Sequence, residues 1–96
     1  MIGGICLRFR ALPAAAQQVL GAAAALDQRL SAERLARATV LDRPIVEEVL
    51  DLLEWNRWLV ADARGYVFAA PIERAVLLQE MVTPGQARRY RKNLGT

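Results

Sequence analysis

Four carboxylates within residues 47–54 are the side chains of this sequence that come closest to a chemical site. They are Glu47, Glu48, Asp51 and Glu54, and Trp55 follows them directly. Such a cluster could in principle attract a hard cation. Calcium, however, also needs converging carbonyl oxygens, which helical positions seldom supply. We therefore expect no metal at this stretch.

The rest of the sequence gives little support for catalysis. It contains no histidine, the usual acid–base group near neutral pH, and its lone cysteine, Cys6, has no histidine to activate it. A glycine-rich phosphate loop with a lysine and a set of zinc ligands are also missing. We expect a protein that is not an enzyme and has no cofactor. A single cysteine also favours a reducing compartment, the cytoplasm.

Charge is unevenly spread along the chain, whose formal net charge is +3. Residues 1–41 carry five arginines against two acids, a net charge of +3. Residues 42–55 carry one arginine against five acids (−4), and residues 56–96 carry seven bases against three acids (+4). Positive charge favours nucleic-acid binding only where it lies on the surface that contacts the nucleic acid. Here it lies toward the two ends of the chain.

The order of the elements predicts the fold. Ile5, Leu7 and Phe9 alternate with other residues, which predicts a short strand over residues 5–10. Helical spacing and caps predict helices over residues 14–26, 31–39, 42–55, 71–81 and 84–94. Aromatic and β-branched residues around a glycine-containing turn predict a hairpin, the wing, over residues 57–69. We predict one domain, residues 1–96, that is mainly α with a small β-hairpin: a winged helix-turn-helix with about four to five helices.

Local signals predict how these helices begin, end and pack. Ser31 and Asp42 are expected N-caps, and Thr83 with Gln86 should form a capping box. Asn56 is expected to end the helix at 42–55 in the left-handed conformation. The core face of that helix should hold Val46, Val49, Leu50 and Leu53. In residues 71–81 the same spacing selects Ile72, Ala75, Val76 and either Leu78 or Gln79.

The outer face of the helix at 42–55 has two interpretations. Its acids can simply solvate the surface, as most runs of charge do. Alternatively, Leu52 and Trp55 form an apolar island within an acidic rim, and this face contacts a protein. The island and its rim are Glu47, Glu48, Asp51, Leu52 and Trp55. Trp55 could also fold under the hairpin against Trp58 or Tyr66.

DNA binding is the alternative function. The third helix of a winged helix usually enters the major groove, but the carboxylates here would meet a polyanion that is bound mainly by cations. The duplex would then be held by the wing and the basic C-terminal helix. The candidate residues are Arg43, Arg64, Arg88, Arg89, Arg91 and Lys92.

Several motifs resemble one family of larger proteins. The sequence LEWNRWLVADARGYVFA, followed by PIERAVLLQEMVTPGQARRYRKNL, resembles the winged-helix segment after the nucleotide-binding module of bacterial signalling ATPases of the STAND class. The shared motifs are Leu30-Ser31, Leu35-Ala36, the tryptophan-containing junction at 53–59, Gly65-Tyr66, and Met81 with residues 83–89. The similarity covers about residues 10–94.

This resemblance implies a protein-contact and relay element that packs against a nucleotide-binding module. The 96 residues contain neither that module nor the tetratricopeptide repeats that often follow. The chain is therefore either a domain cut from a longer ATPase or a free-standing relative, and autoinhibition of an attached ATPase is not carried over to a free-standing chain. We expect a regulatory signalling module whose partner is another protein or domain, such as a nucleotide-binding module, or a second copy in a homodimer. Because no apolar run reaches about 18 residues, we expect no membrane partner.

Overall fold

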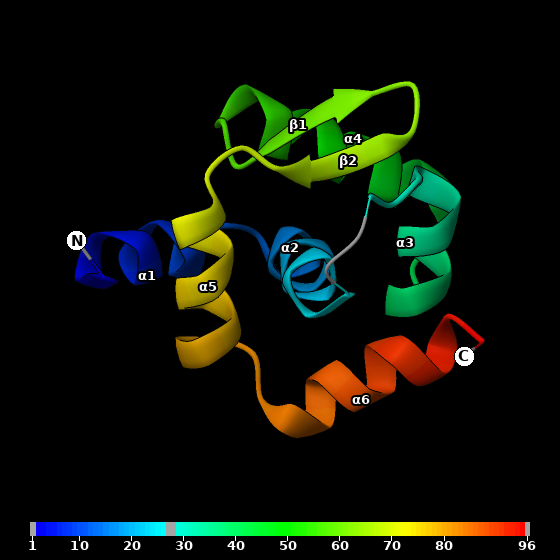
Figure 1. Cartoon of the computed structure of the whole chain (residues 1–96). Coiled ribbons are helices and arrows are strands. Elements are labelled where there is room, and N and C mark those ends of the chain that lie inside the picture. Colours follow the sequence, from blue (N-terminus) through cyan, green and yellow to red (C-terminus); the bar gives the residue numbers. More distant parts are fainter. Residues whose placement is uncertain (1, 27–28, 96) are drawn as a thin grey trace.

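The computed structural model describes residues 2–26 and 29–95. These residues form six helices and a hairpin (Figure 1), in the order α1 (Ile2–Arg10), α2 (Ala14–Leu26), α3 (Ala32–Thr39), α4 (Arg43–Trp55), β1 (Leu59–Asp62), β2 (Gly65–Phe68), α5 (Pro71–Glu80) and α6 (Pro84–Asn93). The fold is mainly helical with one small antiparallel hairpin, as predicted. It has six helices rather than four or five.

The additional helix is α1, so the predicted strand over residues 5–10 is wrong. Ile5, Cys6 and Phe9 are buried, whereas Leu7 is 65% exposed. Residues 5 and 9 are four apart and therefore lie on one face of a helix. Their pattern is compatible with a helix as well as with a strand. α1 packs against α5, and Arg8 is paired with Glu73 at 2.9 Å.

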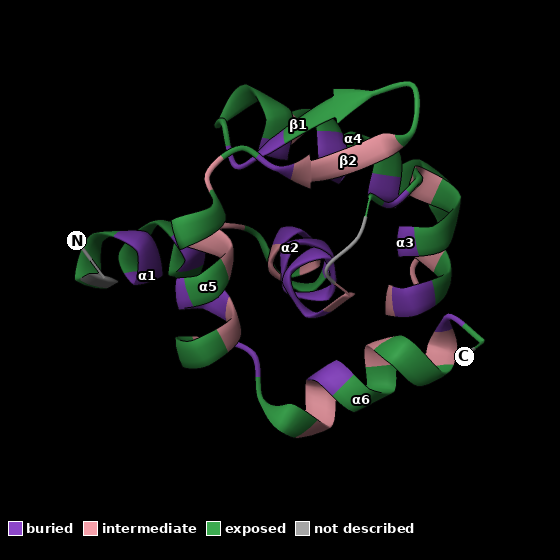
Figure 2. Ribbon diagram, viewed as in Figure 1, coloured by how far each residue is buried: buried purple, intermediate pink, exposed green. Residues whose placement is uncertain are grey.

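α2 is the centre of the domain. In Figure 1 it is seen almost end-on, with α5, α6, α3, α4 and the hairpin arranged around it. Figure 2 shows that it is buried on nearly every side, and its buried residues are Ala16, Val19, Leu20, Gly21, Ala22, Ala23, Ala24 and Ala25. The small alanine side chains allow several neighbours to approach one helix closely, and their methyl groups still contribute buried apolar surface.

α3 and α4 follow one another as predicted, across a tight turn. Ser31 Oγ accepts a hydrogen bond from the Arg34 N–H at 3.2 Å, the predicted cap. Asp42 precedes α4, but its side chain makes no capping hydrogen bond. Val40, in the turn, has a left-handed backbone with φ 57° and is 76% exposed. This conformation is strained for a β-branched residue, because its Cβ crowds the following carbonyl.

The hairpin follows α4 after a second left-handed residue. That residue is Arg57, with φ 63°, and not Asn56, whose φ is −84°. In the hairpin Leu59 pairs with Phe68, and Asp62 pairs with Gly65. Leu30 adds a bridge on the other edge of β2: its N–H donates to the Tyr66 carbonyl at 3.2 Å, and the Tyr66 N–H donates to the Leu30 carbonyl at 2.8 Å. The hairpin is thus attached to the chain just before α3 as well as to α4.

α5 and α6 complete the domain. The buried residues of α5 are Val76 and Leu77. Val76 was predicted, but Ile72 is 57% exposed and Ala75 is also exposed, so the predicted face was wrong for these two. α6 begins with the predicted capping box: Thr83 Oγ1 accepts from the Gln86 N–H at 3.1 Å. None of the helices in the described parts of the chain is long and apolar enough to span a bilayer.

Candidate protein-binding surface on α4 and the hairpin

α4 has a buried face and an acidic outer face. The four residues predicted for the core, Val46, Val49, Leu50 and Leu53, are all buried. Glu47, Glu48, Asp51 and Glu54 are all exposed. The helical repeat explains the division, because positions three and four residues apart share a face. The structure therefore places the predicted acidic residues together, in contact with solvent.

The two tryptophans at the end of α4 have opposite environments. Trp55 is 84% exposed, whereas Trp58 is 1% exposed. The left-handed Arg57 between them turns the chain, so that Trp58 enters the core and Trp55 stays on the last turn of the helix. The guanidinium of Arg8 lies 4.3 Å from the centre of the Trp58 ring. The alternative that Trp55 packs beneath the hairpin is therefore wrong.

Trp55 belongs to an apolar strip that also contains Leu52 and Ile45. Leu52 is half-buried against the core, and Ile45 is 42% exposed. Residues 45 and 52 are seven positions apart, and residues 52 and 55 are three apart, which places all three along one side of the helix. Glu48 lies between them on the same side. The sequence prediction omitted Ile45, although its spacing of seven residues from Leu52 was a usable signal.

Tyr66 connects the hairpin to the acidic face. Burial is the main cause that raises the pKa of its hydroxyl above 10.0, and the negative charges of Glu54, Asp51 and Glu47 raise that pKa further. Those three acids recur every three or four residues on α4, so one stripe of carboxylates lies within electrostatic range of the hairpin. The exposed residues of α4, together with Tyr66, are hereafter called the α4 face. It comprises Ile45, Glu47, Glu48, Asp51, Leu52, Glu54, Trp55 and Tyr66.

Few of the acids on the α4 face are neutralised. Glu47 is paired with Arg43 at 3.3 Å, one helical turn earlier. Glu48, Asp51 and Glu54 form no ion pair with another residue that the structure describes. An exposed pair such as Arg43–Glu47 contributes about 0.2–1 kcal/mol. The α4 face therefore keeps a negative potential around an exposed tryptophan.

The basic residues predicted for DNA are not gathered on one surface. Arg43 lies at the first residue of α4, beside the acids, and Arg64 is exposed in the turn of the hairpin. Arg88, Arg89, Arg91 and Lys92 all belong to α6, which lies across α2 from α4 and the hairpin (Figure 1). Arg91 donates to the carbonyl of Ala25 at 3.4 Å. The structure thus brings together the bases of α6, but not with Arg43 or Arg64.

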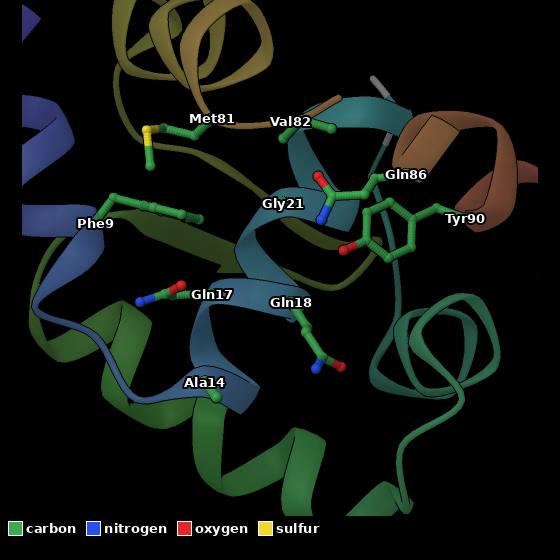
Figure 3. A pocket seen from close by; sticks show the side chains of 9 residues that line it. All are labelled: Phe9, Ala14, Gln17, Gln18, Gly21, Met81, Val82, Gln86 and Tyr90. Atoms are coloured by element: carbon green, nitrogen blue, oxygen red, sulfur yellow. The ribbon is translucent and has the colours of Figure 1, made fainter. Parts of the chain in front are cut away.

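A pocket of about 310 Å³ lies between α1, α2 and α6 (Figure 3). Its polar lining consists of Gln17, Gln18, Gln86 and Tyr90, with no charged side chain. Gln17 donates to the carbonyls of Arg10 and Leu12, and Gln86 accepts from the Thr83 N–H. Two of these amides therefore hold the backbone in place. Neither here nor elsewhere in residues 2–26 and 29–95 is a group of three potential metal ligands present.

Known proteins give no further information about this surface. No family model, no curated protein and no solved structure matches the chain. Its function is therefore inferred from the surface itself.

Proposed function

We propose that this chain is a winged helix-turn-helix module without enzymatic activity, which regulates a signalling protein by binding it through the α4 face. The observation that carries the proposal is Trp55, which is 84% exposed among carboxylates. A large exposed aromatic side chain is costly to leave in water and is typical of the residues that anchor protein interfaces. The location that suits such a module, with one buried cysteine, is the cytoplasm.

The charge and shape of the α4 face support a protein partner. The carboxylates around Trp55 disfavour a nucleic acid and favour a basic protein surface, because complementary charge accelerates encounter and excludes wrong partners. Trp55 and Ile45 supply apolar area for the centre of such a contact, and the acids form its rim. A nucleotide-binding module, which the resemblance to STAND-class ATPases implies, is one candidate partner.

Capture by paired bait variants tests this proposal. The full chain, Trp55→Ala and Ile72→Ala are used as baits in lysate of the organism that encodes the chain. Ile72 is a matched control, because it is 57% exposed but lies on α5, outside the α4 face. We expect a partner that is retained by the full chain and by Ile72→Ala and lost by Trp55→Ala. Circular dichroism should show that both variants are folded. A partner captured equally by Trp55→Ala, or none at all, would contradict the proposal.

A second candidate function is binding of a nucleic-acid backbone by α6. Arg88, Arg89 and Lys92 are exposed and form no ion pair with another described residue. A fluorescent duplex titrated at several salt concentrations tests it, since each neutralised phosphate contributes about −0.9 to the slope of log K against log salt. Arg88→Gln with Arg89→Gln should weaken binding and reduce that slope. Unchanged binding by this pair would exclude α6 as the contact.

A further inference from the structure

The domain carries opposite charges on two faces that point away from each other. α4 and α6 both pack against α2, and Figure 1 shows them on opposite sides of it. The outer surface of α4 is acidic, and the outer surface of α6 carries Arg88, Arg89 and Lys92. We call these three residues the α6 face. Because α2 separates the two faces, they cannot neutralise each other within one molecule.

Both faces keep their charges available. Glu48, Asp51 and Glu54 on α4 lack ion pairs with described residues, as do all three bases of the α6 face. The spacing also matches: Asp51 and Glu54 are three residues apart, and so are Arg89 and Lys92. At 1.5 Å per residue, each pair spans about 4.5 Å along its helix axis. Two such helices laid side by side could therefore align two opposite-charge pairs.

Trp55 also suits the α6 face. No large apolar side chain is exposed on α6, so an apolar group cannot meet Trp55 there. Guanidinium groups, however, stack favourably on indole rings, and the α6 face has two of them. In this domain Arg8 already lies 4.3 Å from the Trp58 ring centre. An arginine-bearing helix therefore satisfies both the acids and the tryptophan of the α4 face.

We propose that the α4 face of one copy binds the α6 face of a second copy, so that the chain associates head to tail. The proposal rests on the proposed function and names the partner as the chain itself. Such a contact is heterologous: each added copy leaves one free acidic face and one free basic face, so association continues to a ring or a filament. One helix on another buries an area at the small end of specific interfaces, and the contact is therefore weak and transient.

Charge reversal on each face provides the test. The acid-reversed variant is Glu48→Lys with Asp51→Lys, and the base-reversed variant is Arg89→Glu with Lys92→Glu. All four positions are exposed, so the substitutions do not enter the core. Sedimentation velocity on the full chain is run over a range of concentrations, at low salt and at about 0.5 M salt, where exposed charges are strongly screened.

Head-to-tail association gives a specific pattern of results. The sedimentation coefficient of the original chain should rise with concentration at low salt and should fall again at high salt. Each variant alone should stay monomeric. An equimolar mixture of the two variants should associate again, because the α6 face of the acid-reversed variant can bind the α4 face of the base-reversed variant, and the two reversed faces are also complementary in charge. A chain that carries all four reversals should regain concentration-dependent association.

Other results overturn the proposal. Association of the base-reversed variant with itself would show that α4 pairs with α4, as in a two-fold dimer. A mixture that does not associate, or an original chain that remains monomeric at every concentration, would show that the faces do not bind each other. A monomeric chain whose α6 face binds duplex DNA would equally overturn it. The base-reversed variant keeps the α4 face intact, so capture of a partner by this bait would leave the proposed function standing while the self-association fails.

Discussion

Gly65 offers the sharpest prediction about the fold. Its φ is +133°, and a Cβ added there would lie 2.6 Å from the carbonyl oxygen of Leu30. That oxygen belongs to the backbone, so no rotation of a side chain can move it away. A Gly65→Ala change must therefore distort the glycine backbone, displace the chain at Leu30, or do both.

The size of the effect follows from these two terms. An alanine held at an unfavourable φ costs about 1–3 kcal/mol. Displacing Leu30 loses its two hydrogen bonds with Tyr66, of 3.2 and 2.8 Å, and each contributes about 0.5–1.5 kcal/mol net. We expect Gly65→Ala to lower the free energy of unfolding by about 2–6 kcal/mol. Since small domains have only about 5–15 kcal/mol in total, this approaches complete unfolding.

Urea unfolding followed by circular dichroism measures the loss, with Gly4→Ala as the matched control. A Cβ at Gly4 would meet nothing within 4 Å, and Gly4 lies exposed in α1. Alanine is favoured over glycine in helices by about 1 kcal/mol, so Gly4→Ala should leave stability unchanged or raise it. A loss below about 1 kcal/mol for Gly65→Ala would refute the reasoning, because it would mean that the bridge to Leu30 contributes little.

Three further predictions concern the α4 face and its supports. Because the pKa of Tyr66 is raised in the folded state, the domain should keep its stability below pH 10.0 and lose it as the pH rises through the folded value. Asp51→Asn should lower that pKa, measured by phenolate absorbance and assigned with Tyr66→Phe; an unchanged titration would contradict the proximity of hairpin and helix. Val40→Asn should raise the free energy of unfolding of the domain by about 1 kcal/mol, measured by urea unfolding, since asparagine tolerates the left-handed conformation. A lower free energy of unfolding would show that the valine is not strained. Trp58→Ala should cost about 3–5 kcal/mol and Trp55→Ala less than about 0.5, and similar losses would contradict their different burial.

The regular elements with strong helical spacing were predictable from the sequence. α4 has a clear helical repeat, and its four buried residues follow directly from a helical wheel. The cap at Ser31 and the capping box at Thr83 depend only on nearby residues, so local sequence was sufficient for both. The hairpin was predicted from its turn, where Asp62, the last residue of β1, pairs with Gly65, the first residue of β2.

The remaining features depend on tertiary packing that local patterns do not encode. α1 is a helix because Ile5, Cys6 and Phe9 pack into the core; six residues are too few to distinguish the two periodicities. The buried side of α5 is set by three neighbours, α1, α2 and β2. The positions of its apolar residues therefore did not determine which side of the helix faces the core.

For the candidate site, the acids could be predicted as a group, but the environment of Trp55 could not. That environment depends on the backbone turn at Arg57, a residue whose type does not favour the left-handed conformation.

The alanine-rich α2 has a consequence for how the domain opens. Its residues contact α3, α4, α5 and α6, so its amide protons reach solvent only if several of these helices separate together. Amides of α2 should therefore exchange with deuterium more slowly than those of α1, which packs at the periphery. The same crowding means that a change as small as Ala22→Val, at a position with 0% exposure, forces extra volume into a packed centre. Substitutions in this protein should therefore accumulate most slowly at the buried alanines of α2.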